Sequence, residues 1–268
     1  MKNLINNRNL LIEDQNEGEP VTTCMDVYKA KIQSDGSLHK LKLIIVVIGD
    51  LQNKELVGDT WSPTSSMRTL KYFLGDEIKH KERVHQLDFI GAFLQAKVKN
   101  RVFVKLDIRY TYYFPGYANY FGRALILLKP VYGMTKTEKL FSDELTERFL
   151  EASFIPYQFK MFIYYKYAPD RSRIFFLSYV DDCVYWYTNE DIGKWFVDTL
   201  RKRFHVNFLG YAHWFMSIRI SQIKDHSISV NQAIYDTSIV SKYLDTTIVK
   251  VSTTFYKTTF PDDMIFKK

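Results

Sequence analysis

The sequence predicts an α+β fold built around an antiparallel sheet. Two adjacent aspartates, Asp181 and Asp182, separate the apolar and aromatic runs 174–180 and 183–187, a pattern typical of a β-hairpin with the acidic pair at its turn. Strand-like runs and helical patterns follow one another without regular βαβ alternation. At 268 residues, 46% hydrophobic and 16% aromatic, the chain can bury the core of one large domain or two small ones.

The N-terminal part predicts a polar tail followed by a hairpin. Residues 1–24 are rich in Asn, Glu and Gly and show little periodicity, so they predict a tail without regular structure. Residues 27–32 and 38–48 are runs of strand-forming residues, and Asp35-Gly36 between them is a strong signal for a tight turn. We therefore expect two antiparallel strands here, the second ending before Gly49.

Three segments have the apolar spacing of amphipathic helices. The first follows Ser65 or Ser66, the second covers residues 137–152, and the third follows Thr188 or Asn189. Small polar residues at these positions can cap the first and third helices. The apolar faces comprise Met67, Leu70, Phe73 and Leu74; Leu140, Phe141, Leu145 and Phe149; and Ile192, Trp195, Phe196, Leu200 and Phe204.

The composition is compatible with a basic protein of a reducing compartment and does not specify a function. The formal net charge is +7 with a pI near 9.1, which fits a polyanionic partner and does not require one. Cys24 and Cys183 match neither a zinc spacing nor a disulfide framework, so a reducing compartment is expected. The longest aliphatic run, residues 44–48, is too short to span a bilayer, and the polar N-terminus lacks a secretory signal. We expect no membrane partner.

The acidic pair points to metal-dependent phosphoryl transfer if a third carboxylate joins it. Two carboxylates at a hairpin tip can share divalent ions, and an enzyme that joins or cuts phosphodiesters needs carboxylates from more than one element. Asp88 ends the predicted strand 84–89, and a strand beside the hairpin would bring it to the tip. Simpler interpretations stay open: Asp181-Asp182 is also a favourable turn, and Asp88 is also an ordinary strand-end or helix-cap residue.

Four motifs occur in an order that resembles a known family. They are Gln86-Leu87-Asp88-Phe89 with Ala92-Phe93-Leu94, then Leu128-Lys129-Pro130-Val131-Tyr132-Gly133-Met134, then Tyr179-Val180-Asp181-Asp182, and then Phe208-Leu209-Gly210. Each motif alone is weak, whereas the four in order resemble the reverse transcriptase of copia-type LTR retrotransposons. The resemblance runs from about Val27 to Leu244, which is most of the chain.

The resemblance implies a right-hand polymerase fold of fingers and palm, with an antiparallel sheet that carries the YVDD hairpin. It implies that Asp88, Asp181 and Asp182 are the catalytic carboxylates and hold two Mg²⁺ ions, with Mn²⁺ as an alternative metal. The implied reaction is RNA-directed DNA synthesis, in which a primer 3′-hydroxyl attacks the α-phosphate of an incoming dNTP. The implied partners are an RNA or DNA template with its primer, and dNTPs.

The resemblance also implies contacts to the substrates. Phe93 falls on the steric-gate position that excludes ribonucleotides, and Leu209-Gly210 falls near the primer grip. Lys42 in the basic fingers strand, and Lys136 at the position of a nucleotide-contacting Gln, are further nucleotide-binding candidates. On the residues alone, Phe93 is also a core phenylalanine, Leu209-Gly210 is also a turn after the third helix, and Lys136 is also a solvated helix-start residue.

The sequence departs from the family pattern at several positions. Ile44 and Ile48 replace basic residues of the fingers strand, which removes charge-assisted contacts worth roughly 1.5–3 kcal/mol each when desolvated. Phe141 stands where the family has a Trp, and Ser217 stands where it commonly has Gly. These departures raise the hypothesis of a catalytically inactive remnant that still binds nucleic acid.

The organisation expected from the resemblance is a tail at 1–24, a fingers and palm domain at 25–245, and a remnant of the connection to a ribonuclease H region at 246–268. The chain has no room for the other polyprotein domains, so we expect a fragment or decayed copy of an element. Such enzymes work in cytoplasmic retrotransposon particles. The remaining alternative is a plain globular protein with an Asp-Asp turn and no polymerase role, which predicts that Asp88 lies far from Asp181.

Overall fold

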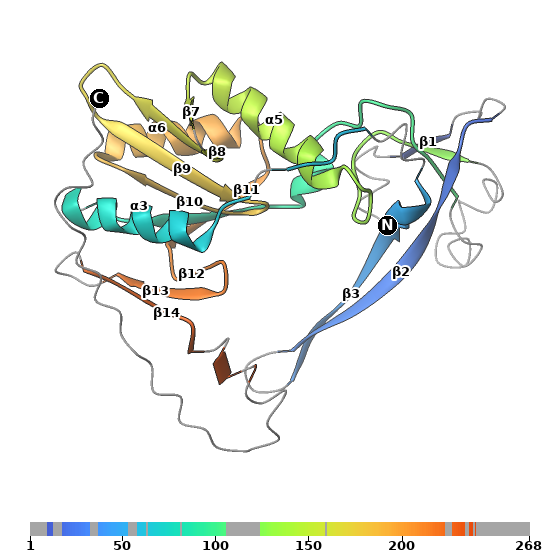
Figure 1. Cartoon of the computed structure of the whole chain (residues 1–268), viewed down its shortest axis with the longest axis horizontal. Coiled ribbons are helices and arrows are strands. Elements are labelled where there is room, and N and C mark those ends of the chain that lie inside the picture. The colour runs from blue at the N-terminus through green and yellow to red at the C-terminus, as the bar shows by residue number, and fades with distance from the viewer. Residues whose placement is uncertain are drawn as a thin grey trace. The chain divides into compact units, whose positions relative to one another are not determined.

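The chain forms two compact units, each with its own sheet and core (Figure 1). Unit 1 comprises residues 1–63 and 91–148, and unit 2 comprises residues 64–90 and 149–268. This computed structural model describes residues 10–12, 18–32, 37–52, 58–62, 64–80, 82–105, 124–158, 160–222, 227–233, 236–237 and 239. The expected segment 246–268 and the predicted turn at Asp35-Gly36 lie outside the described residues.

Unit 1 is built on a sheet whose described strands have the order β1-β6-β5-β2-β3. These strands are β1 (Leu10–Ile12), β2 (Val21–Ile32), β3 (Leu38–Val47), β5 (Phe103–Lys105) and β6 (Leu125–Leu127). The 3-10 helices η1 (Gly49–Leu51) and η2 (Ala92–Gln95) and most of helix α5 (Thr137–Glu151) complete the unit. Its main core consists of the buried residues Val47, Val104, Leu125, Leu127, Val131 and Met134.

The predicted N-terminal hairpin is confirmed, but its first strand is longer than predicted. β2 and β3 pair antiparallel from Cys24↔Val47 onward. β2 begins at Val21, within the expected tail, because residues 21–23 pair in parallel with β5. β1 also lies within the expected tail and pairs with β6. The partner strands lie far away in the sequence, so local patterning did not indicate these strands.

Two glycines in unit 1 allow two backbone segments to cross closely. Gly133 has φ +85°, and a Cβ there would overlap the carbonyl of Val47. A Cβ on Gly49 would likewise overlap the Gly133 carbonyl. The Val47 N–H donates to the Tyr132 carbonyl at 2.8 Å across the same crossing. Glycine is therefore required on both sides, since any side chain would force the two segments apart.

Unit 2 contains two sheets. The larger has the described strand order β11-β4-β10-β9-β8-β7, and the smaller has the order β12-β13-β14. The strands are β4 (His85–Phe89), β7 (Ile155–Tyr157), β8 (Lys160–Tyr167), β9 (Arg173–Tyr179), β10 (Asp182–Tyr187), β11 (Val206–Tyr211), β12 (Trp214–Phe215), β13 (Ile218–Gln222) and β14 (Ile228–Asn231). The helices are α3 (Met67–His80) and α6 (Glu190–Arg201).

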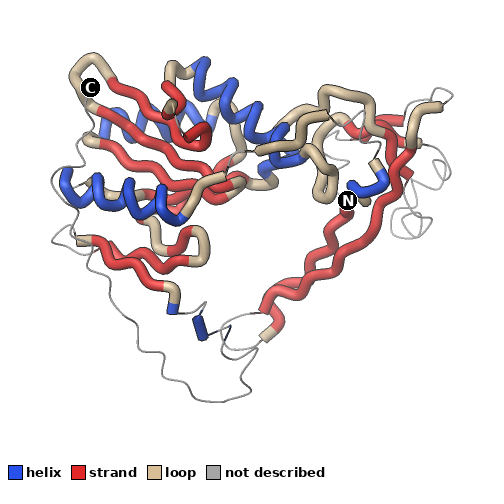
Figure 2. The backbone as a smooth tube through the Cα atoms, in the orientation of Figure 1, coloured by secondary structure: helices blue, strands red, loops and turns tan. Residues whose placement is uncertain are grey.

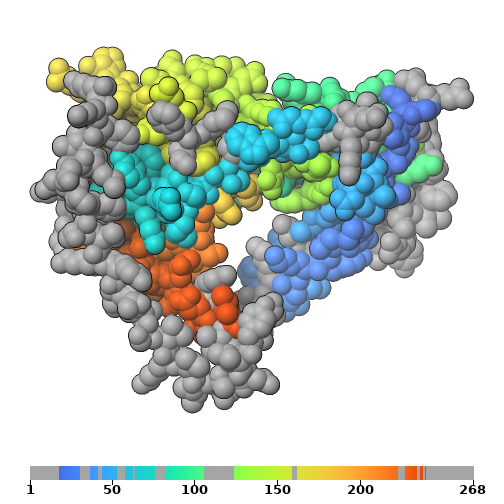
Figure 3. Space-filling view, in the orientation of Figure 1, coloured from blue at the N-terminus to red at the C-terminus, as the bar shows by residue number. Residues whose placement is uncertain are grey.

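The two helices cover opposite faces of the larger sheet (Figure 2). Because side chains alternate along a strand, Phe175 of β9 faces α3 while Phe176 faces α6. On the α3 side, the core also takes in Phe215 and residues of β13, so α3 packs against both sheets. Figure 3 shows the side chains of α3 (teal) and of the smaller sheet (orange) meeting on one face of unit 2.

The three predicted helices are confirmed, and their caps are now assigned. α3 follows Ser66, whose Oγ accepts from the Thr69 N–H at 3.2 Å. α6 follows Asn189, whose Oδ1 accepts from the Ile192 N–H at 3.0 Å. The longest helix within the described ranges, α5, has 15 residues, fewer than the roughly 20 that a bilayer-spanning helix needs.

Ser217 occupies a turn that favours glycine, and replacing it by Gly is expected to stabilise unit 2. Met216 and Ser217 join β12 to β13 with φ +50° and +62°, the geometry of a type I′ turn. Ser217→Gly is expected to raise the free energy of unfolding by about 0.5–1 kcal/mol in urea titrations, because glycine relieves the left-handed strain. Ser221→Gly, within β13, is the control and should destabilise; an equal loss in both variants would contradict the expectation.

Candidate functional site

Adjacent strands of the larger sheet place Asp88 directly opposite Asp182. β4 pairs antiparallel with β10 in the register Asp182↔Asp88, and β10 pairs with β9 in the register Asp182↔Tyr179. Directly opposed residues of an antiparallel pair point to the same face, with Cβ atoms about 4.5–5.5 Å apart. The two carboxylates therefore project from neighbouring strands at one end of the sheet.

Asp181 lies in the two-residue turn between β9 and β10, which β4 holds in place. The Phe89 N–H donates to the Asp181 carbonyl at 3.3 Å. Val180, the other turn residue, has φ +57°, an uncommon conformation for a β-branched side chain. Backbone strain of this kind often occurs at functional sites. The turn thus holds Asp181 next to the Asp88–Asp182 pair.

Burial and neighbouring negative charges disfavour the ionised form of Asp182. All three aspartates are half-buried. Burial raises the pKa of the Asp182 carboxyl above its ordinary value, and the negative charges of Asp181 and Asp88 raise it further. The ionised form of Asp182 is thus disfavoured by its burial and by its two acidic neighbours.

The chemistry of the three side chains suits a divalent cation. Carboxylate oxygens are ligands that Mg²⁺ prefers. A cation among them would offset both the burial and the repulsion that raise the pKa of Asp182. Within the described ranges, however, no three His, Cys, Asp or Glu side chains are arranged as a ready-made metal site. The aspartates thus supply the type of oxygen donor that the ion prefers, from two neighbouring strands and the adjoining turn. They are not arranged as a complete metal-binding group.

Leu209 and Gly210 form a β-bulge beside Asp88, not a turn after the third helix. β11 pairs with β4 through Asn207↔Asp88, and the register shifts between Phe208 and Gly210, which leaves Leu209 as the extra residue. Gly210 has φ +77°, which suits the left-handed position of a bulge. Leu209 is 51% exposed, so the bulge presents an apolar side chain to solvent on the strand that pairs with β4.

The remaining candidates belong to unit 1. The Phe93 ring, in η2, meets the Tyr132 ring edge-on at 5.1 Å between centroids. Lys136 is half-buried in the turn before α5. Lys42 lies in β3 opposite Lys29, and its side chain is outside the described residues.

Two contacts, one in each unit, were not predicted. Gln52, after η1, accepts from the Thr135 N–H at 2.8 Å and from the Thr135 hydroxyl at 2.9 Å. Asn207 lies opposite Asp88 on its other side. The sequence did not predict either contact, because both depend on pairing between distant segments.

His85 lies at the other end of β4, surrounded by aromatic rings. Its ring stacks on Tyr185 and Tyr187 with centroids 5.2 and 4.9 Å away, and Tyr211 lies at 5.1 Å. Burial lowers the pKa of His85 below its ordinary value, although the charge of Glu190 partly opposes this. The fold therefore favours the neutral imidazole.

This environment predicts that acid weakens the fold through His85. The unfolded chain takes up a proton below about pH 6.5, whereas folded His85 resists it, so stability falls as the pH drops through that range. His85→Phe keeps the ring contacts and should lose less stability between about pH 7.5 and about pH 5.5 in urea unfolding. The same pH dependence in both proteins would show that other groups are responsible.

Comparison with known proteins assigns the family. The model of the family described as reverse transcriptase (RNA-dependent DNA polymerase) matches residues 7–257. The chain is 26% and 25% identical, over 211 residues, to retrovirus-related Pol polyproteins from transposons RE2 and RE1 of Arabidopsis thaliana. Each alignment covers 76% of this chain and 14% of the polyprotein. The predicted resemblance is confirmed: the chain belongs to the reverse transcriptase (RNA-dependent DNA polymerase) family, in the branch carried by copia-type retrotransposons.

Proposed function

We propose that the chain is an RNA-directed DNA polymerase whose catalytic residues are Asp88, Asp181 and Asp182. The observation that carries the proposal is the register Asp182↔Asp88, with Asp181 in the adjoining turn. The alternative of a plain globular protein predicts that these carboxylates lie apart, and the strand pairing argues against it. On this proposal, residues 25–245 comprise fingers and palm, and β9 and β10 form the catalytic hairpin of the palm.

The three aspartates would hold two Mg²⁺ ions, or Mn²⁺ in their place. Ions held there would supply positive charge that lowers the pKa of a primer 3′-hydroxyl and neutralises the triphosphate. The pairing of β4 and β10 holds Asp88 and Asp182 opposite one another, and the Phe89 contact holds Asp181. The hydrogen bonds of the sheet, and not only a loop, thus fix the positions of the three carboxylates.

The proposed substrate contacts follow the family pattern. Leu209 and Gly210 are the primer-grip candidates, and their bulge adjoins the strand that carries Asp88. Phe93, Lys42 and Lys136 are the nucleotide-binding candidates. The partners proposed on the same basis are an RNA or DNA template with its primer, and dNTPs, within a cytoplasmic retrotransposon particle.

Primer extension tests the proposal directly. The whole chain is incubated with a DNA primer on an RNA template, dNTPs and Mg²⁺, beside a homologous full-length reverse transcriptase. Extension that requires Mg²⁺ is the expected result. Extension by the homologous enzyme alone would overturn the proposed activity and leave the family assignment intact.

Phe93 is expected to set the preference for deoxynucleotides. Its ring is held edge-on against Tyr132, and a bulky ring at this position would collide with a ribose 2′-hydroxyl. Phe93→Val should raise ribonucleotide incorporation relative to deoxynucleotide incorporation by about tenfold or more in single-nucleotide extension assays. Phe93→Tyr keeps the ring and serves as the control. An unchanged ratio in the valine variant would remove Phe93 from the role of steric gate.

A second candidate function is nucleic-acid binding without catalysis. Ile44 and Ile48 of the fingers segment replace basic residues of the family pattern, so the chain has lost two cations suited to holding a triphosphate. This alternative predicts salt-sensitive binding to an RNA–DNA hybrid with no nucleotide incorporation. Binding that does not change with salt would count against it.

A further inference from the structure

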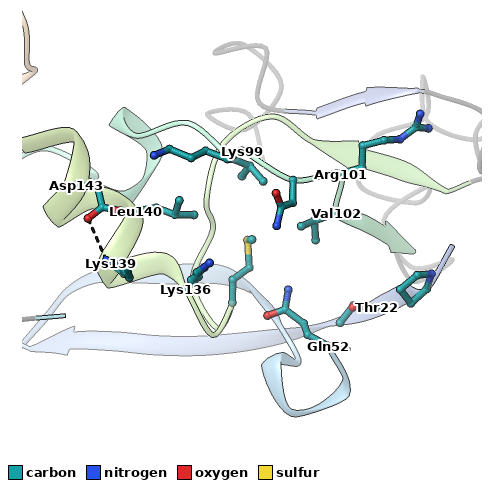
Figure 4. Close-up of a pocket in the computed structure, with 13 residues that line it drawn as sticks. Thr22, Gln52, Lys99, Arg101, Val102, Lys136, Lys139, Leu140 and Asp143 are labelled. Carbon is teal, nitrogen blue, oxygen red and sulfur yellow. Dashed lines mark hydrogen bonds and ion pairs between the residues drawn. The ribbon is translucent and has the colours of Figure 1, made fainter. Parts of the chain in front are cut away.

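A cavity of about 220 Å³ lies wholly within unit 1, and none of the three aspartates lines it (Figure 4). Four segments that are distant in sequence meet around it: β2 at Thr22, the end of η1 at Gln52, the loop 98–102, and the start of α5. Lys136, Lys139, Leu140 and Asp143 all line it. Their spacing of three and four residues places them on one face of the helical segment.

Two of the four basic residues that line the cavity are already paired with acidic side chains. Lys139 Nζ lies 3.2 Å from Asp143 and 3.7 Å from Asp59. Arg101 Nε lies 3.2 Å from Glu19. These ion pairs supply no free charge to a ligand, and they hold two walls of the cavity in place.

The other two basic residues, Lys99 and Lys136, have no ion-pair partner in the part of the chain that the structure describes. They reach the cavity from different segments, Lys99 from the loop and Lys136 from the turn before α5 (Figure 4). Two cations that lack an ion-pair partner among the described residues favour a ligand with two negative charges.

Gln52 adds a hydrogen-bond donor to the same cavity. Only its carbonyl oxygen can accept from the Thr135 N–H, so the two bonds from Thr135 fix the orientation of the amide. The NH₂ end of Gln52 therefore faces away from Thr135, and Gln52 lines the cavity. This donor suits an anionic oxygen.

The rest of the lining is apolar and the volume is small. Val98, Val102, Met134 and Leu140 supply apolar surface. At about 220 Å³ the space is smaller than the roughly 300–1,000 Å³ of drug-sized sites. A bare inorganic anion would leave this apolar surface without contacts, whereas a compact apolar body attached to the anion would cover it.

We propose that this cavity binds a small phosphomonoester, a dianionic phosphoryl group attached to a compact apolar or aromatic body. Lys99 and Lys136 hold the phosphoryl oxygens, Gln52 donates to one of them, and the apolar walls contact the body. The site goes beyond the proposed polymerase function, because it uses neither the three aspartates nor a template, although it shares Lys136 with the proposed nucleotide contacts. The phosphomonoester is either a free metabolite or the 5′-phosphorylated end of a nucleic-acid strand.

Titration of the whole chain with phenyl phosphate, followed by the ³¹P line width, tests the proposal. EDTA is included, so that the aspartates cannot hold phosphate through a metal. We expect saturable binding that is tighter than that of inorganic phosphate. Lys99→Gln and Lys136→Gln should each weaken it by about tenfold or more. Lys97→Gln, an exposed neighbour that does not line the cavity, should stay within about twofold.

Several results would overturn the proposal. They are non-saturable binding, equal loss in the Lys97→Gln and Lys99→Gln variants, and inorganic phosphate that binds as tightly as phenyl phosphate. Asp182→Asn should bind phenyl phosphate as tightly as the wild type does, because Asp182 does not line the cavity. A negative result in this titration and a negative result in primer extension therefore have separate meanings. Displacement of phenyl phosphate by a 5′-phosphorylated oligonucleotide, and not by its 5′-hydroxyl form, would support a strand end as the source. Displacement by neither would support a free small molecule.

Discussion

Asp182→Asn is expected to lower primer extension by about 10³-fold or more while leaving the fold as stable as before or more stable. Asp182 lies opposite Asp88 and beside Asp181, so on the proposed function its amide variant removes a charge that the metal-holding set needs. The same change relieves the repulsion that, together with burial, raises the pKa of Asp182. Activity and stability should therefore change in opposite directions, as measured by extension rates and urea unfolding.

The matched control for this variant is Asp198→Asn. Asp198 is an exposed aspartate of α6 that belongs to none of the catalytic motifs, and its replacement should leave both rate and stability unchanged. A wild-type rate in the Asp182 variant would remove this residue from catalysis. A loss of activity together with a loss of stability would indicate that Asp182 supports the fold and not the chemistry.

Trp186→Ala is expected to lower the free energy of unfolding of unit 2 by about 3–5 kcal/mol. The Trp186 side chain is 1% exposed and joins α3 to the sheet. Its ring stacks on Phe175 at 5.5 Å between centroids and lies 5.4 Å from Phe73. Alanine would leave a large cavity among these rings. Urea unfolding followed by circular dichroism measures the change.

Trp186→Phe separates the contribution of the ring from that of the indole N–H. The Trp186 Nε1 is buried and has no hydrogen-bond partner among the described residues, so phenylalanine removes an unsatisfied donor while keeping an aromatic ring. We expect it to lose less than about 1.5 kcal/mol. Equal losses in the two variants would show that the core depends on the full indole, and no loss in the alanine variant would contradict the role of Trp186 in packing.

Local patterning predicted the helices well because their stabilising contacts repeat within one segment. The apolar spacing that begins at Met67 gave the position of α3, and the small polar residue Asn189 marked the start of α6. The start of β2 was predicted six residues too late, because residues 21–23 are strand only through β5. A parallel partner some eighty residues away leaves no mark on local sequence.

At the candidate site, too, local features could be predicted and contacts between distant segments could not. The sequence indicated that Asp88 ends a strand and that Asp181-Asp182 lies in a turn, and the ordered motifs suggested that they meet. It did not show which residue faces Asp88, because register depends on the pairing of two distant strands. The bulge at Leu209 was missed for a related reason: a Phe-Leu-Gly run is compatible with either a turn or a strand.

The register between β4 and β10 makes the site more sensitive to changes in chain length than to most changes in side chain. Consecutive residues of a strand face opposite sides of the sheet, so sliding β10 by one position would turn Asp182 away from the face that carries Asp88. One codon gained in the turn, or the loss of the Val180 codon, could thus separate the carboxylates while leaving every aspartate in the gene. Among copies of such an element, the exact spacing within the hairpin is therefore a stricter mark of a working site than the presence of the acidic residues.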